Sequence, residues 1–408
     1  MSKTVWIINQ YASTPDYGYA GRHYYLGQEL AKLGYKVYLV ASANHHLLRV
    51  KPELNSNFNI HKLSDGFNMV WCAMPEYKEA HNKKRVLGWF FFSWRICNLI
   101  KIIPDSPDVL VCSSPSLISF LGAQYISRNF RSKLVFEVRD IWPLTLIDIG
   151  GYSKNNPFIR VMQWVEDFAY RKSDHVISNL KNAAEHMKNH GLEPSKFTWI
   201  PNGFSLREAQ KNAPLNIEAL SQLPREKFIV GYTGTIGVAN ALDILIDAAD
   251  ILKGFDDIRF VLVGEGKEKK SLEEYALAKK INNVVFLKSI PKLEIQSILS
   301  EFDACYIGWL NDDLYKFGIG ANKIPEYLFS SKPIVHAYSG ACDPISENKS
   351  GITVPAGDAS NLASAILKLY KMPVSEREEM GARGRKAALE QYEYGMLARN
   401  YARILFDQ

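Results

Sequence analysis

Residues Gly318 to Val335 read GIGANKIPEYLFSSKPIV, and the organisation of the whole chain can be worked out from this stretch. Glycines lead into Asn322 and Lys323, an amphipathic helix carrying Glu326 follows, and an apolar strand comes after Pro333. A glycine-bearing turn that opens a helix suits phosphate, because backbone N–H groups and the helix dipole point at the anion. Lys323 adds a full positive charge, so the stretch predicts a phosphate site.

Glu326 gives the same stretch a second possible role. It lies one helical turn after Lys323, so both side chains are expected on one face of the helix. A carboxylate does not favour phosphate, but it accepts hydrogen bonds from a ribose diol, as acidic residues do in dinucleotide sites. The alternative is a plain Lys–Glu surface pair at a spacing of three residues.

Short apolar runs alternate with amphipathic helical stretches on both sides of a polar segment, Ser205 to Glu226, which we interpret as a linker. This alternation predicts an α/β fold of two tandem Rossmann-like domains. The expected domains are residues 1–204, joined by a C-terminal helix at about 393–408 that packs back across the junction, and residues 205–392. The expected strands are Val5–Ile8, Val37–Ala41, Val70–Ala73, Val109–Cys112, Leu134–Val138, His175–Ile177 and Phe197–Ile200, then Phe228–Tyr232, Phe260–Val263, Val284–Leu287, Ala304–Ile307, Ile334–His336 and Ile352–Val354.

The composition is that of a globular protein. The 408 residues are 47% hydrophobic and 23% charged, with a net charge of +6. Its 5 cysteines show no CxxC spacing, which indicates thiols of a reducing compartment and neither a disulfide framework nor a zinc site. The N-terminus runs directly into an apolar strand, and no uninterrupted apolar segment is long enough to span a membrane. We therefore expect a cytoplasmic protein without a signal peptide.

The second domain presents further loops suited to a nucleotide, because ligands of open α/β sheets bind beyond the carboxyl ends of the strands. After Val230 the chain reads GYTGTIG, and after Val263 it reads GEGK, each leading into a helix. The candidate donor-binding residues there are Gly234, Thr235, Gly237, Gly264 and Gly266. Tight turns without a ligand are the alternative.

The first domain offers different groups. Asp140 follows a buried strand in the sequence EVRDIWP, where a carboxylate can hold or deprotonate an acceptor hydroxyl. A salt bridge with Arg139 or a helix cap would explain Asp140 equally well. His23, in a glycine-bearing loop that includes Gly21, is either a positioned donor or a satisfied loop histidine. That loop is not GxGxxG, so it does not predict a dinucleotide fingerprint.

A basic and aromatic segment, residues 81–101, begins HNKKRVLGWFFFSWR and contains no acidic residue. Basic residues interleaved with aromatic ones are typical of a helix that lies in a bilayer interface. The residues assigned to acceptor or membrane contact are Lys83, Lys84, Arg85, Trp89, Phe91, Trp94 and Arg95. A core helix with a basic start is the alternative, and nucleic acid is disfavoured because nothing else builds a basic groove.

The ordered set of motifs resembles retaining glycosyltransferases of family 4 with the GT-B fold, in particular the bacterial O-antigen and capsule group typified by WbuB. The residues that carry the resemblance are the Gly18–Arg22 loop followed by YYLGQELAKLGYKV, VRDIWP at 138–143, IPNG at 200–203, YTGTIGVANALD at 232–243, VGEG at 263–266 and NKIPEY at 322–327. The resemblance implies a cleft between two Rossmann-like domains, with a UDP-sugar held mainly by the C-terminal domain and an acceptor by the N-terminal domain. It also implies transfer with retention and without a metal or other cofactor.

The resemblance assigns roles to particular residues. Glu326 matches the second glutamate of the family's paired-glutamate motif and is expected on the ribose, whereas Gly318 stands where the first glutamate would fall. The family's Arg and Lys phosphate partners are absent from TGTIGVAN, so we expect Asn322, Lys323 and the backbone of residues 234–237 to hold the diphosphate. Asp140, Lys323 and His23 are the candidate catalytic residues, with Asp140 orienting the acceptor, and Gly21 joins the donor-binding set.

The resemblance also suggests the substrates: UDP-linked N-acetyl-L-fucosamine as donor and a lipid-linked sugar of the undecaprenyl diphosphate type as acceptor. Such an enzyme would work peripherally at the inner face of the cell membrane. The alternatives are a UDP-sugar 2-epimerase of the same architecture and a non-catalytic protein that binds sugar nucleotides. An NAD-dependent oxidoreductase is disfavoured because GxGxxG opens neither half.

Overall fold

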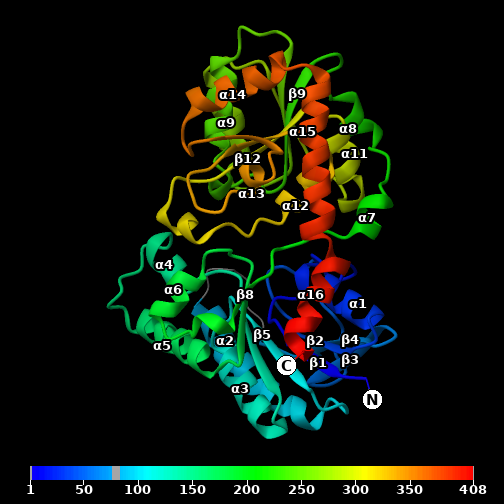
Figure 1. Ribbon diagram of the computed structural model, residues 1–408, viewed down its shortest axis with the longest axis vertical. Coiled ribbons are helices and arrows are strands. Elements are labelled where there is room, and N and C mark those ends of the chain that lie inside the picture. Colours follow the sequence, from blue (N-terminus) through cyan, green and yellow to red (C-terminus); the bar gives the residue numbers. More distant parts are fainter. Residues whose placement is uncertain (1, 76–82, 408) are drawn as a thin grey trace. The chain divides into compact units, whose positions relative to one another are not determined.

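The computed structural model describes residues 2–75 and 83–407, with the backbone alone for residues 83–85 (Figure 1). Contacts divide the chain into an N-terminal unit, Met1–Asn202 with Tyr394–Gln408, and a C-terminal unit, Gly203–Glu393. Each unit is a sheet covered by helices on both faces, so the predicted α/β fold of two Rossmann-like domains is confirmed.

The sheet of the N-terminal unit has the strand order β3-β4-β2-β1-β5-β6-β7-β8. Only β3 runs antiparallel to its neighbour, and it is a strand that the sequence did not predict. Its side chains alternate between partly buried and exposed, so it lacks the continuous apolar run that marks a central parallel strand. The strands are β1 Thr4–Ile8, β2 Lys36–Ser42, β3 Phe58–Ser64, β4 Phe67–Cys72, β5 Val109–Ser113, β6 Lys133–Val138, β7 His175–Ser178 and β8 Phe197–Trp199.

The helices of this unit connect the parallel strands. They are α1 Arg22–Lys32, α2 Lys83–Ile96, α3 Ser119–Phe130, α4 Leu144–Asp148, α5 Pro157–Lys172, α6 Ala184–Asn189 and α16 Tyr394–Phe406. Two of them begin at identifiable signals. The Asn156 side chain caps α5 by accepting from the N–H of Phe158, and Pro157 occupies the first turn.

The C-terminal helix α16 completes the N-terminal unit, where it lies beside α1 (Figure 1). Tyr25 stacks on Tyr394 with ring centroids 5.0 Å apart, and Tyr35 stacks on Phe406 at 4.3 Å. The ammonium of Lys133 donates to the carbonyl of Ile404, which lies in the last turn of the helix where backbone acceptors lack partners. This terminal helix is therefore part of the core of the first domain.

The C-terminal unit is an all-parallel sheet with the order β11-β10-β9-β12-β13-β14. Alternate residues of β9 enter different cores: Val230 packs with α9 and α14, whereas Ile229 packs with α11 and α12. The strands are β9 Phe228–Thr233, β10 Ile258–Val263, β11 Val284–Leu287, β12 Ala304–Gly308, β13 Ile334–Ala337 and β14 Gly351–Val354. The longer helices are α9 Leu242–Ile251, α10 Lys269–Ala278, α14 Ala359–Lys371 and α15 Val374–Ala387, and the shorter ones include α11 Ile295–Ser300, α12 Lys323–Phe329 and α13 Pro344–Glu347.

The polar segment interpreted as a linker, Ser205 to Glu226, is folded. It forms two short helices, α7 Leu206–Gln210 and α8 Ile217–Ser221, within the C-terminal unit. Both are capped by side chains, Ser205 for α7 and Asn216 for α8. Polar capping residues and prolines are common to linkers and to short capped helices, which is why composition alone did not separate the two.

Candidate functional site

The strand order of the C-terminal unit locates its ligand edge. The chain proceeds from β9 outward to β11 and then returns to place β12 on the other side of β9. The connections after β9 and β12 therefore diverge at their carboxyl ends, which is where open α/β sheets bind ligands. The loop 234–237 follows β9 directly. The predicted phosphate loop thus lies at the switch point of the sheet.

Helix α12 is held against this loop by Tyr327. Its buried hydroxyl accepts a 2.6 Å hydrogen bond from the N–H of Thr233, the last residue of β9, and donates to the carbonyl of the same residue at 3.1 Å. Lys323 lies one turn earlier on α12. The apolar core around Tyr327 therefore fixes where the Lys323 side chain can reach.

The Lys323 ammonium reaches the β9 loop. Its Nζ donates to the hydroxyl of Tyr232 at 2.8 Å and to Oδ1 of Asn240 at 2.7 Å, and it lies 4.2 Å from the centroid of the Tyr232 ring. The Tyr232 hydroxyl and the Asn240 amide nitrogen both donate to the carbonyl of Thr235, at 2.6 and 3.0 Å. Lys323 is thereby part of a closed set of hydrogen bonds that also orders the loop.

The environment of Lys323 disfavours its charge. Burial lowers the pKa of Lys323 to about 7. Among the described residues no carboxylate pairs with it, since its hydrogen-bond partners are a hydroxyl and an amide oxygen. An ammonium without a counter-ion, next to a glycine loop at the ligand edge, is arranged to receive an anion.

The glycines predicted at this edge are close-packed. A Cβ on Gly264 would collide with the carbonyl oxygen of Gly234, and a Cβ on Gly266 with that of Ile236. Gly234 has a φ of +140°, and Gly264 has a φ of +154°, values that favour glycine. Gly237 has open space around it, with the Thr235 methyl as its nearest neighbour. The β10 loop can thus lie against the backbone of the β9 loop because Gly264 and Gly266 carry no side chain.

Glu326 does not pair with Lys323, so the surface-pair alternative is not what the structure contains. Its carboxylate forms an ion pair with Lys292, and its side chain lines a pocket together with Phe204, Ser205, Glu208 and Gln296. Asn322 is exposed at the start of α12. This helix has only 7 residues, so the charge of Lys323 matters more at this edge than the helix dipole on which the sequence argument also relied.

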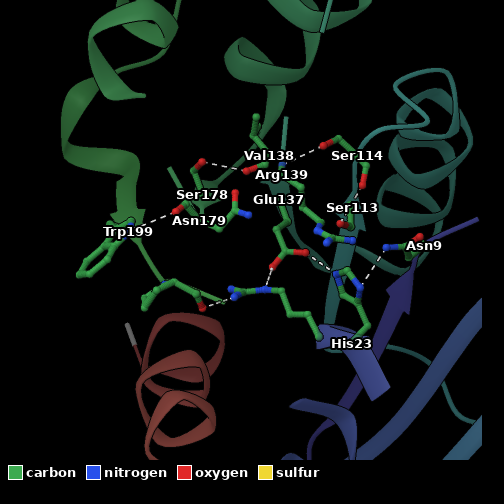
Figure 2. A network of polar contacts seen from close by, with 12 residues as sticks. Asn9, His23, Ser113, Ser114, Glu137, Val138, Arg139, Ser178, Asn179 and Trp199 are labelled. Carbon is green, nitrogen blue, oxygen red and sulfur yellow. Dashed lines mark hydrogen bonds and ion pairs between the residues drawn. The ribbon is translucent and has the colours of Figure 1, made fainter. Parts of the chain in front are cut away.

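In the N-terminal unit a polar network joins the carboxyl ends of several strands (Figure 2). Glu137 of β6 is fully buried, and its carboxylate accepts from Arg22 Nε at 2.9 Å and contacts His23 Nε2. The other ring nitrogen of His23, Nδ1, lies 2.9 Å from the Asn9 amide nitrogen. Since that amide donates, Nδ1 accepts and the ring proton sits on Nε2, facing Glu137.

This network corrects the assignment of His23. The side chain is 3% exposed, both ring nitrogens are engaged, and burial lowers its pKa, which favours the neutral imidazole. His23 is therefore a positioning group inside α1 and not a group that touches substrate. Gly21 lies at the N-cap of α1, also in the N-terminal unit, with only the ring of Tyr19 near its position.

Asp140 remains accessible. It lies just after β6 and is exposed, whereas the residues that precede it on the strand are buried. The backbone N–H of its neighbour Arg139 donates to Ser114 Oγ at 2.9 Å, which ties this loop to the end of β5. Desolvation raises the pKa of the Asp140 carboxyl and the charge of Arg139 opposes that shift, while its role toward an acceptor hydroxyl stays a prediction.

Helix α2, Lys83–Ile96, forms the central part of the basic and aromatic segment, and its described side chains lie on two faces, one buried and one exposed. Trp89 is 3% exposed and donates to the Tyr11 hydroxyl at 2.6 Å, so it is a core residue and not the membrane contact that was predicted. Leu87 and Trp94 are 68% and 63% exposed. The Arg95 guanidinium lies 4.7 Å from the Phe91 ring centroid. Residues 81 and 82 and the side chains of Lys83, Lys84 and Arg85 lie outside the described part.

Three residues of this site were not singled out from the sequence. Tyr232 and Asn240 hold Lys323, and Lys292 pairs with Glu326. Tyr232 and Asn240 lie within the quoted motif YTGTIGVANALD, but their partner Lys323 is 91 and 83 residues away along the chain. Lys292 carries no local signal.

Two glycosyltransferase family models match this chain, one in each half. The model "Glycosyltransferase Family 4" matches residues 21–208, and the model "Glycosyl transferases group 1" matches residues 227–372. The first lies in the N-terminal unit and the second in the C-terminal unit, apart from a few residues at the boundary. The chain thus matches glycosyltransferase models in both units, and its fold is the GT-B fold.

Relatives and solved structures agree with this assignment. A putative colanic acid biosynthesis glycosyl transferase of Escherichia coli, WcaI, is 23% identical over 63% of this chain, and the match spans 64% of the relative's length. The fold is similar to sucrose-phosphate synthase from Thermosynechococcus elongatus, at 14% identity and a TM-score of 0.76 over 98% of both chains. It is also similar to Anabaena HepE in complex with UDP, at 15% identity and a TM-score of 0.69 over all of both chains.

Proposed function

We propose that this glycosyltransferase transfers a sugar from a UDP-sugar to a lipid diphosphate-linked saccharide, with retention of configuration and without a metal ion. The proposed product is a bacterial surface polysaccharide of the O-antigen or capsule type. The protein would act in the cytoplasm, at the inner face of the cell membrane.

The observation that carries the donor proposal is the Lys323 ammonium at the switch point of the C-terminal sheet. Its partners Tyr232 and Asn240 are neutral, so a diphosphate would provide the negative charge that the described surroundings lack. Uridine is the proposed base because the similarly folded HepE was solved with UDP. Glu326 would accept hydrogen bonds from the ribose once its ion pair with Lys292 opens.

The proposed chemistry places most of the catalysis at the leaving group. Negative charge develops on the β-phosphate as the bond to the sugar breaks, and a preorganised cation at that point stabilises the transition state. Lys323, Asn322 and the backbone of residues 234–237 would supply this stabilisation. The leaving phosphate would take the proton of the acceptor hydroxyl, Asp140 would orient that hydroxyl, and no protein nucleophile is then required.

The acceptor proposal rests on α2. Leu87, Phe90 and Trp94 recur at helical spacing and are all exposed, while Trp89, Phe92 and Ile96 face the core. An exposed apolar stripe that follows a basic start is suited to a membrane interface. None of the described helices combines the length and apolar character that crossing a membrane requires. The specific donor sugar that we propose, N-acetyl-L-fucosamine, rests on the WbuB-like motifs.

The test combines binding with turnover. Calorimetry of UDP, GDP and NAD in EDTA-containing buffer is expected to give saturable binding of UDP. UDP-N-acetyl-L-fucosamine and other UDP-sugars are then incubated with a lipid diphosphate-linked sugar, and the product is expected to be a lipid-linked saccharide one sugar longer, with the anomeric configuration of the donor. Epimerised donor without transfer would indicate the 2-epimerase, and binding without turnover would indicate the non-catalytic alternative. NAD binding with indifference to UDP and GDP would overturn the proposal.

A further inference from the structure

A cluster of carboxylate, imidazole and amide groups joins α5 to α6 in the N-terminal unit, away from the loops considered above. Glu166 and Asp167 are adjacent on α5, and His190 follows α6. One ligand atom from each lies within 4.8 Å of the other two. No metal ligands were predicted from the sequence, and none of these side chains was among the candidate site residues.

The three ligand atoms converge on one point, which the Gln163 amide now occupies. Gln163 Nε2 lies 2.8 Å from Glu166 Oε2, 2.8 Å from Asp167 Oδ1 and 2.8 Å from His190 Nδ1. An amide nitrogen carries two hydrogens and can satisfy only two such acceptors. His190 Nδ1 also lies 2.9 Å from Asp167 Oδ1, and in the tautomer with its hydrogen on Nε2 a cation at this point would meet lone pairs of all three ligands.

The charge around the cluster favours a cation as well. The Glu166 side chain is 1% exposed, and among the described residues neither Lys nor Arg forms an ion pair with Glu166 or Asp167. Two adjacent carboxylates, one of them buried, are costly to keep ionised without a compensating positive charge. Among the described residues, the basic side chains that contact these carboxylates are His186 and His190.

Supporting groups already orient the buried ligand. The Tyr170 hydroxyl donates to Glu166 Oε1 at 2.8 Å, and His186 Nε2 lies 3.1 Å from the same oxygen. The other oxygen of Glu166 is thereby directed toward the cluster. Outer partners of this kind hold metal ligands in place in many sites.

We propose that Glu166, Asp167 and His190 bind a zinc ion that joins α5 to α6. Imidazole and carboxylate together suit Zn²⁺, whereas Mg²⁺ prefers oxygen ligands alone. Three protein ligands leave a fourth position for water once the Gln163 amide has moved away. The ion would act as a structural link within the N-terminal unit, separate from the transfer reaction.

Calorimetric titration of the EDTA-treated full chain with Zn²⁺ tests the proposal. The expected result is one equivalent bound and a thermal unfolding midpoint that rises with Zn²⁺ but not with Mg²⁺. Asp167→Asn and His190→Ala should each weaken Zn²⁺ binding at least about tenfold, as loss of a ligand does. Gln163→Ala should tighten it, because the competing amide is gone. Glu185→Ala, an exposed acidic residue on the same helix as His186, serves as the matched control and should behave as wild type.

Co²⁺ distinguishes this cluster from the free cysteines. Co²⁺ bound here should give weak visible bands without the intense near-ultraviolet absorption of thiolate ligands. No saturable Zn²⁺ binding to the wild-type chain would overturn the proposal. So would Zn²⁺ binding that survives both Asp167→Asn and His190→Ala with its affinity unchanged.

Discussion

Lys323 Nζ lies 2.8 Å from the hydroxyl of Tyr232 and 4.2 Å from the centroid of its ring, and burial lowers the lysine pKa to about 7. The Tyr232 hydroxyl accepts a hydrogen bond from the Lys323 ammonium and donates one to the carbonyl oxygen of Thr235. A lysine held in this way is poised near neutrality, so a bound anion can change its protonation.

UDP binding should therefore take up a proton at Lys323. Because the free-state pKa is lowered and a diphosphate favours the charged form, we expect affinity to be constant below pH 7 and to fall above it. The limiting slope is about tenfold per pH unit for one proton. Calorimetry at pH 6.5, 7.5 and 8.5, in buffers of different ionisation enthalpy, measures both affinity and proton uptake.

Lys323→Arg provides the control, since guanidinium stays charged throughout this range and the pH dependence should disappear. Lys323→Ala should lower kcat by about 10²–10³-fold, in line with removal of a group that stabilises developing charge. Near-normal turnover of the alanine variant would contradict a phosphate role for Lys323.

Glu326 should recognise the ribose hydroxyls. Glu326→Ala is expected to weaken UDP binding about tenfold, corresponding to roughly 1.4 kcal/mol for a lost hydrogen bond to a charged acceptor. Wild type should prefer UDP to 2′-deoxy-UDP, and the variant should bind both alike. A preference that persists in Glu326→Ala would assign ribose recognition to another group.

The exposed face of α2 should bind membranes, and its buried face should not. Leu87→Ala combined with Trp94→Ala is expected to reduce partitioning onto anionic vesicles at least about tenfold, because each side chain contributes about 1.5–3 kcal/mol on burial. Leu277→Ala, 79% exposed on α10, is the matched control and should leave partitioning unchanged. Equal loss in both variants would mean that the effect is not specific to α2.

Trp89→Ala tests whether the buried face of α2 stabilises the N-terminal unit. Since Trp89 is 3% exposed and packs on Trp142 and Phe158, we expect loss of about 3–5 kcal/mol in unfolding free energy. Urea denaturation measures this. Unchanged stability together with reduced vesicle binding would contradict the buried role of Trp89 and support the predicted membrane contact.

Gly264 should be intolerant of any side chain. Gly264→Ala would force the β9 and β10 loops apart, because its Cβ would collide with the Gly234 carbonyl at a φ of +154°. We expect a lower unfolding midpoint and greatly weakened UDP binding. Gly254→Ala, which meets nothing within 4 Å, should change neither. If Gly264→Ala bound UDP as tightly as wild type, the packing of the β9 and β10 loops would not be required for donor binding.

The alternation of short apolar runs with helical stretches was enough to predict the two α/β domains and nearly all their strands. Such runs mark strands buried on both faces, and this property is visible in local sequence. The glycine loops and Lys323 were recognisable for the same reason. Glycines and a lysine between an apolar run and a helical stretch can be seen within a short piece of sequence. The edge strand β3 and the short helices α7 and α8 lack that signal.

Only the tertiary structure decided which of the singled-out side chains are accessible. His23 is closed off by Glu137 and Asn9, Trp89 by Tyr11, and Glu326 is paired with Lys292, each from a partner distant in the sequence. Burial and charge pairing depend on which segments the sheet order brings together. The sequence by itself therefore determined which candidate side chains this chain contains. The packing determined which of those side chains are accessible to a ligand.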